Sequence, residues 1–148
     1  MYSNDNPASP SVHRAAVFLG LAGLLPFIAL GLCVPFMAPS WQTQAVQAVV
    51  AYGAVILSFL GGVHWGAALT GHNDNPWRYG YAVMPSLLGW VAVLCDDAGP
   101  ALFLLSTGLL VTFFVDRAVY GRMHWYTLLR AALTLVATTS LYMAYQSL

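Results

Sequence analysis

The chain has 148 residues, of which 59% are hydrophobic and only 7% are charged. Soluble domains carry about 25% charged residues, so this composition excludes a water-soluble protein. A formal net charge of zero also excludes nucleic acid as a partner, because binding to phosphates requires a basic surface.

Five apolar stretches follow a polar segment at residues 1–14, which is expected to be disordered. Crossing about 30 Å of hydrocarbon takes about 20 helical residues. The predicted helices span residues 15–37, 45–70, 78–95, 100–119 and 127–146. Short loops join them, so the sequence predicts an all-α membrane protein, a five-helix up-and-down transmembrane bundle that forms one domain over residues 15–148.

Arginines predict the orientation of this bundle, because basic loops stay on the cytoplasmic side of a membrane. Arg14 precedes the first predicted helix and Arg78 opens the third. Arg117, Arg122 and Arg130 flank the fourth and fifth, whereas the alternate loops lack basic residues. We therefore expect a cytoplasmic N-terminus and a periplasmic C-terminus in a bacterial inner membrane.

The first and third predicted helices each contain a proline near the middle. Pro26 and Pro85 remove a backbone donor and clash with the preceding turn, so a kink is expected at each. Kinks can expose carbonyl groups to a cavity, but proline is common in membrane helices. We interpret both prolines as determinants of shape.

Cys33 and Cys95 lie toward the outer ends of the same two predicted helices. An oxidising periplasm would allow a disulfide between them, and both could equally be small buried hydrophobic residues. The sequence leaves the two alternatives open.

Small residues recur at every fourth position of the second predicted helix, at Ala54, Ser58, Gly62 and Gly66. This spacing places them on one face, where another helix can approach closely. We interpret them as a helix-packing face. The alternative is that the glycines make room for a ligand beside His64.

His64 lies on a different stripe of this helix, inside the predicted membrane region. An imidazole there must stay neutral or find a partner. It could hydrogen-bond to a neighbouring helix, relay a proton, or bind a metal or haem. Haem would need a second ligand at matching depth, and His124 lies too near the surface, so no cofactor and no metal are expected.

Polar residues of the fourth and fifth predicted helices also follow the helical repeat. Thr112 and Asp116 belong to one stripe, and Arg130 and Thr134 to another. The two stripes can meet as an antiparallel seam in which Asp116 and Arg130 form a salt bridge, since either ion alone would be costly in a membrane. The alternative is a lumen in which Asp116 and His64 handle a proton or cation.

Three segments of the chain resemble an uncharacterised membrane family, domain-of-unknown-function 3429. They are Leu-Ser-Phe-Leu-Gly-Gly-Val-His-Trp-Gly at 57–66, Met-Pro-Ser-Leu-Leu-Gly-Trp at 84–90, and residues 125–134. The resemblance implies five helices and a proteobacterial or mitochondrial inner membrane, and it implies no activity. The motif positions that it marks as candidates are His64, Trp65, Pro85, Trp90, Asp116 and Arg130.

Two functions agree with these features. The favoured one is a non-enzymatic accessory or assembly component, whose small-residue face and aromatic inner rim contact other membrane-protein subunits within the lipid bilayer. The other is a small transporter or channel that could be proton-coupled, with its polar site near His64, Asp116 and Arg130. Enzymatic activity is not expected, because the sequence has no zinc spacing, phosphate loop or nucleophile elbow.

Overall fold

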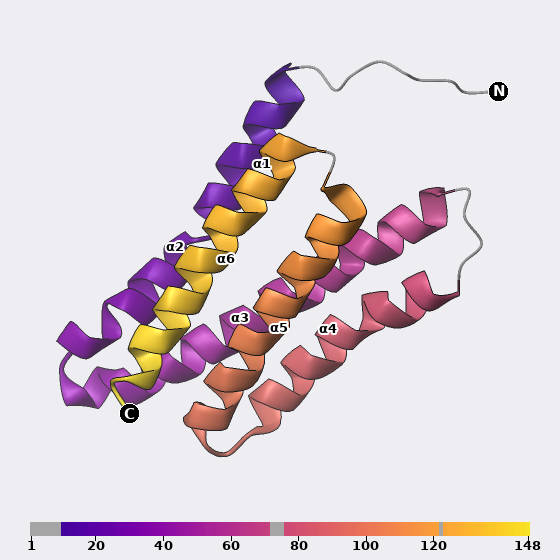
Figure 1. Cartoon of the computed structure of the whole chain (residues 1–148). Coiled ribbons are helices and arrows are strands. Elements are labelled where there is room, and N and C mark those ends of the chain that lie inside the picture. The colour runs from indigo at the N-terminus through magenta and orange to yellow at the C-terminus, as the bar shows by residue number, and fades with distance from the viewer. Residues whose placement is uncertain (1–9, 72–75, 122) are drawn as a thin grey trace.

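The computed structural model describes residues 10–71, 76–121 and 123–148, and this part of the chain is helical throughout, without strands. The elements are α1 (Pro10–Ala22), α2 (Leu25–Phe27), the π-helix η1 (Ile28–Leu32), the 3-10 helix η2 (Val34–Phe36), α3 (Pro39–Thr70), α4 (Trp77–Leu94), α5 (Ala98–Tyr120) and α6 (His124–Tyr145). Successive long helices run up and down (Figure 1). The predicted all-α bundle is confirmed.

Four stretches of the described residues are long and apolar enough to cross a membrane, namely His13–Leu32, Pro39–Thr70, Ala98–Tyr120 and His124–Tyr145. The 18-residue helix α4 is not among them. It carries Arg78 in its first turn, which lowers its hydropathy, and it packs along α3 and α5. Of the five predicted spans, four therefore have the length and composition that a membrane-spanning helix requires. The fifth, α4, belongs to the bundle because it packs against α3 and α5.

The first predicted helix is interrupted. α1 begins at Pro10, so residues 10–14 are helical where disorder was expected, and it ends at Ala22. Pro26 cannot donate to the carbonyl group four residues earlier, which is that of Ala22. The Tyr52 hydroxyl of α3 donates a 2.8 Å hydrogen bond to the next carbonyl group, that of Gly23. At the position of the expected kink, α1 is therefore interrupted by a two-residue turn at Gly23 and Leu24, and helical structure resumes at Leu25.

α3 is longer than expected and begins at Pro39 rather than at residue 45. The prediction placed Pro39 in a loop, but proline suits the first turn of a helix, where its missing N–H group would have no helical partner. With 32 residues, α3 is about 48 Å long. It runs beside α4 and is inclined to α5 and α6 (Figure 1).

Glycines bring the helices into close contact on both sides of α3. A Cβ atom on Gly61 would lie 2.4 Å from the carbonyl oxygen of Ala82, and one on Gly89 would lie 2.9 Å from that of Ala54, so α3 and α4 nearly touch. On the other side, Gly108 of α5 receives the side chain of Leu57. Apolar side chains that are at most 2% exposed fill the centre, including Val49, Leu57, Leu102, Leu105 and Leu141.

Candidate functional site

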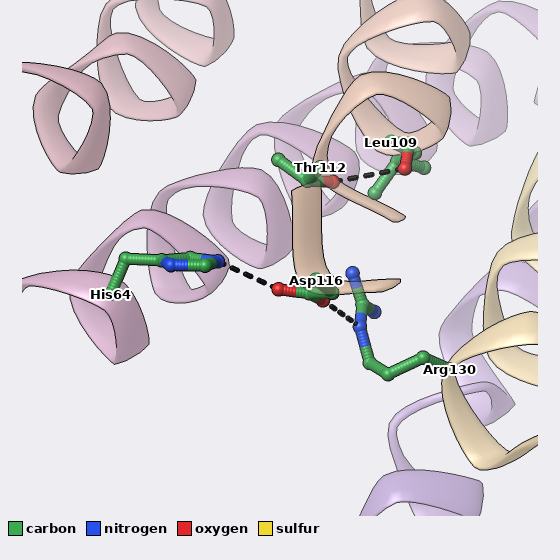
Figure 2. Close-up of polar contacts among 5 residues, drawn as sticks. All are labelled: His64, Leu109, Thr112, Asp116 and Arg130. Carbon is green, nitrogen blue, oxygen red and sulfur yellow. Dashed lines mark hydrogen bonds and ion pairs between the residues drawn. The ribbon is translucent and has the colours of Figure 1, made fainter. Parts of the chain in front are cut away.

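Three helices contribute one charged or polar side chain each to a buried network: His64 from α3, Asp116 from α5 and Arg130 from α6. The Nε2 atom of His64 lies 2.7 Å from Oδ1 of Asp116, and Nε of Arg130 donates to Oδ2 of the same carboxylate. Figure 2 shows Asp116 between its two partners. The pairing of Asp116 with Arg130 is the one that the two polar stripes predict.

The helical repeat explains why these side chains meet. On α5, Gly108, Thr112 and Asp116 follow one another at four-residue steps and are all buried. The same step joins Arg130 and Thr134 on α6. Each stripe therefore faces the bundle interior, and the antiparallel packing of α5 against α6 brings the two together.

The network is almost closed to the surroundings. His64, Asp116 and Arg130 are 6%, 3% and 6% exposed. A carboxylate can only accept hydrogen bonds, so His64 carries its proton on Nε2. Asp116 and Arg130 carry opposite charges, which is the pairing that a low-dielectric interior favours.

Tyrosines surround the imidazole. The ring of Tyr81 on α4 meets that of His64 edge-on, with centroids 5.0 Å apart, and the ring of Tyr120 lies 5.5 Å from it. Tyr126 of α6 continues the cluster against Tyr120 at 5.6 Å. Tyr81 was not among the residues predicted to form the site. The available signal was its four-residue spacing to Pro85, which places both on the face of α4 that meets α3.

Several buried polar atoms at this end of the bundle have no hydrogen-bond partner among the described residues. They are Tyr81 Oη, Tyr120 Oη, Thr127 Oγ1, Arg130 Nη2 and Thr134 Oγ1. The site therefore holds more donors and acceptors than its own side chains pair.

A cavity of about 130 Å³ lies beside the network. Arg130 and Thr134 form its polar edge, and the remaining lining is apolar: Leu19, Gly20, Gly23, Leu24, Phe27, Ile56, Phe59, Leu60, Leu109, Leu133 and Ala137. His64 and Asp116 are not part of that lining. The cavity thus borders Arg130, whereas His64 and Asp116 lie outside its lining.

The family model of DUF3429, described as a protein of unknown function, matches residues 12–146. The chain belongs to this family. It is 37% identical to transmembrane protein 69 of Xenopus tropicalis over 144 residues, which cover 93% of this chain and 56% of the frog protein. It is 31% identical to transmembrane protein 69 of Mus musculus over 134 residues, which cover 86% and 54%. The chain spans about half the length of these relatives, and no solved structure matches it.

The small-residue face predicted for this DUF3429 protein divides into two parts. Ala54 packs against Gly89 of α4, and Ser58 is half-buried. Gly62 and Gly66 are exposed, and a Cβ atom on either would meet nothing within 4 Å. Beside these two glycines the contact with α4 is made by Gly61 instead, so the predicted stripe packs within the chain at Ala54 but not at Gly62 and Gly66.

The other motif residues of the DUF3429 protein lie apart from the network. Pro85 is buried against Gly61, inside a continuous α4. Trp65 is 42% exposed and contacts the ring of Tyr79 at 5.2 Å, whereas Trp90 is 62% exposed. The predicted topological residue Arg122 lies outside the described residues.

Neither a disulfide nor a metal-binding cluster is formed by the described residues of the DUF3429 protein. Cys33 is an exposed free thiol, and Cys95 is a partly buried one whose Sγ lies 3.4 Å from the carbonyl oxygen of Val91. Within the described ranges, no three His, Cys, Asp or Glu side chains gather as a metal site would require.

Proposed function

We propose that this protein is a multi-pass component of an inner membrane that assists the assembly or stability of a larger membrane complex, without enzymatic activity of its own. The observation that carries the proposal is the buried network, in which His64 and Arg130 occupy both oxygens of Asp116. Ionisable groups inside a membrane usually serve either transport or structure. Here His64 and Arg130 both pair with Asp116, and the network ties α3, α5 and α6 together.

The apolar half of the bundle supports this proposal over a channel. The network lies toward the ends of the bundle that carry Arg78 and Arg117. Beyond it, Leu57 fills the space over Gly108, and Leu105 lies against Gly53. An ion cannot cross such a region without a polar path.

An exposed part of α3 offers a surface for a partner. Gly62 and Gly66 lie one turn apart on the outside of the bundle, with open space where a side chain would project. Small residues allow close helix approach, the main source of helix association in lipid. We propose that a transmembrane helix of another subunit packs there.

The test uses leucine substitutions at glycines where an added Cβ atom would meet no other part of the chain within 4 Å. Gly62→Leu and Gly66→Leu each add a side chain to open space, as does the control Gly80→Leu on α4. After purification from native membranes in mild detergent, we expect the unmodified chain and Gly80→Leu in a complex of high mass, and the other two variants released from it. Equal behaviour of all three variants would contradict the proposed surface.

A second candidate is a proton-coupled transporter. The unpaired hydroxyl groups of Tyr81 and Tyr120 beside His64 favour it, because they could extend a hydrogen-bonded path to the imidazole. The same purification separates the two candidates. A chain recovered from its membrane without any other subunit would remove the accessory role and leave transport.

A further inference from the structure

A groove separates the start of α1 from the start of α6. It has a volume of about 450 Å³ and is lined by His13, Arg14, Val17, Phe18, Leu21 and Trp125. It lies outside the buried network, and neither His64 nor Asp116 lines it. Nothing in the proposed function uses it.

The lining changes from polar to apolar along α1. His13 and Arg14 lie in the first turns of α1. The ring of His13 is 4.6 Å from that of Trp125, and this contact links α1 to α6. One to two turns deeper, Phe18 and Leu21 are 71% and 49% exposed. This order matches the bilayer, in which charged headgroups lie above acyl chains and tryptophan marks the boundary.

The charge at this end of the bundle is positive and uncompensated within the described residues. Arg14 forms no ion pair with any of them. Asp116 is the acidic residue described at this end, and His64 and Arg130 already occupy both of its oxygens. The groove therefore offers a guanidinium group and an imidazole to an anion.

We propose that this groove binds one anionic phospholipid. The phosphate is held by Arg14 and His13, and an acyl chain lies along Val17, Phe18 and Leu21. Guanidinium groups pair well with phosphate because their N–H groups match its oxygens. The apolar part of the groove favours a lipid over a free phosphate ion, because an acyl chain can bury apolar surface there and a phosphate ion cannot.

The experiment counts phosphatidylglycerol molecules bound to the delipidated full-length chain by native mass spectrometry. We expect Arg14→Gln to weaken the most strongly bound molecule by about fivefold, the usual contribution of one basic residue at an anionic surface. Val17→Trp, which fills the groove and keeps the charge, should weaken it as well. The matched control is Arg117→Gln, an exposed arginine at the same end of the bundle but outside the groove, and it should bind like the unmodified chain.

Three outcomes would overturn the proposal. Equal binding of phosphatidylcholine would show that the charge is not used. An equal loss of lipid binding in Arg117→Gln would show that any arginine at this end of the bundle contributes, and that the groove is not a specific site. Displacement of the lipid by inorganic phosphate at similar concentration would assign the site to the free ion. Thermal unfolding of each variant verifies that it is folded. If Arg14→Gln does not fold, Val17→Trp still tests the proposal.

Discussion

Asp116 accepts hydrogen bonds from His64 and Arg130 through different oxygens, so removing one partner leaves a buried charge only half satisfied. We expect Arg130→Met to lower the free energy of unfolding by roughly 3 kcal/mol, because an unpaired buried carboxylate is costly. The double variant Asp116→Asn with Arg130→Met should lose less, since it removes both charges. Unfolding of the purified chain by denaturant in detergent micelles measures the difference.

The control for this pair is Arg117→Met. Arg117 is exposed in the last turn of α5, so its loss should change stability by no more than about 0.5 kcal/mol. If the single and double variants at positions 116 and 130 lose the same stability, the salt bridge does not contribute in the way the structure indicates.

At the scale of the elements, the contact between α3 and α4 depends on which glycine of α3 faces inward. Gly61 and Gly62 are neighbours in sequence, but only the first lies against the backbone of α4. Gly61→Ala should destabilise the chain by about 1–3 kcal/mol, because its Cβ atom would overlap the carbonyl group of Ala82 and the helices would have to separate.

Gly62→Ala is the matched control. Its Cβ atom meets open space, and alanine favours a helix over glycine by up to about 1 kcal/mol. We expect this variant to unfold at the same temperature as the unmodified chain or slightly higher. A loss in both variants would mean that the effect belongs to the helix itself and not to its contact with α4.

The same two glycines explain what could be predicted from the sequence. Four-residue spacing shows that a face exists, but Gly53, Leu57 and Gly61 follow the same spacing as Ala54, Ser58 and Gly62. The choice between them depends on where both neighbours of α3 pack, because Gly53 and Leu57 meet α5 whereas Gly61 meets α4. The seam between α5 and α6 was predictable because one short connection fixes how these two helices meet. His64 was placed with Asp116 and Arg130 only in the alternative of a polar lumen, because the rotation of α3 that brings its imidazole against the carboxylate is set by helices distant in sequence.

The break after α1 was partly predictable. Pro26 indicated a kink, but the π-helix that follows depends on a contact that sequence spacing does not contain. A Cβ atom on Gly31 in η1 would lie 2.7 Å from Ser140 of α6, so the irregular turn fits closely against that helix. Irregular backbone inside a membrane requires such protein contacts, because lipid cannot satisfy its polar groups.

At the scale of the whole molecule, the helix ends that carry Arg14, Arg78 and Arg117 gather on one side of the bundle. They belong to the start of α1, the start of α4 and the end of α5 (Figure 1). The described residues at the opposite side include Asp96 and Asp97 and no arginine. Basic residues are retained in the cytoplasm during insertion, whereas acidic residues have little effect. We therefore expect the arginine side of the bundle to face the cytoplasm.

Reporter fusions measure this orientation. A reporter placed after Met37, in the segment before α3, and another at the C-terminus should both report the outer side of the membrane, and one placed after Gly71 should report the inner side. Moving one arginine offers a sharper test, because the charge difference drives insertion. Arg14→Gln combined with Gln42→Arg should weaken or reverse the signals at all three positions, whereas Arg14→Gln alone should have a smaller effect. An inner signal at both Met37 and the C-terminus of the unmodified chain would show the opposite topology.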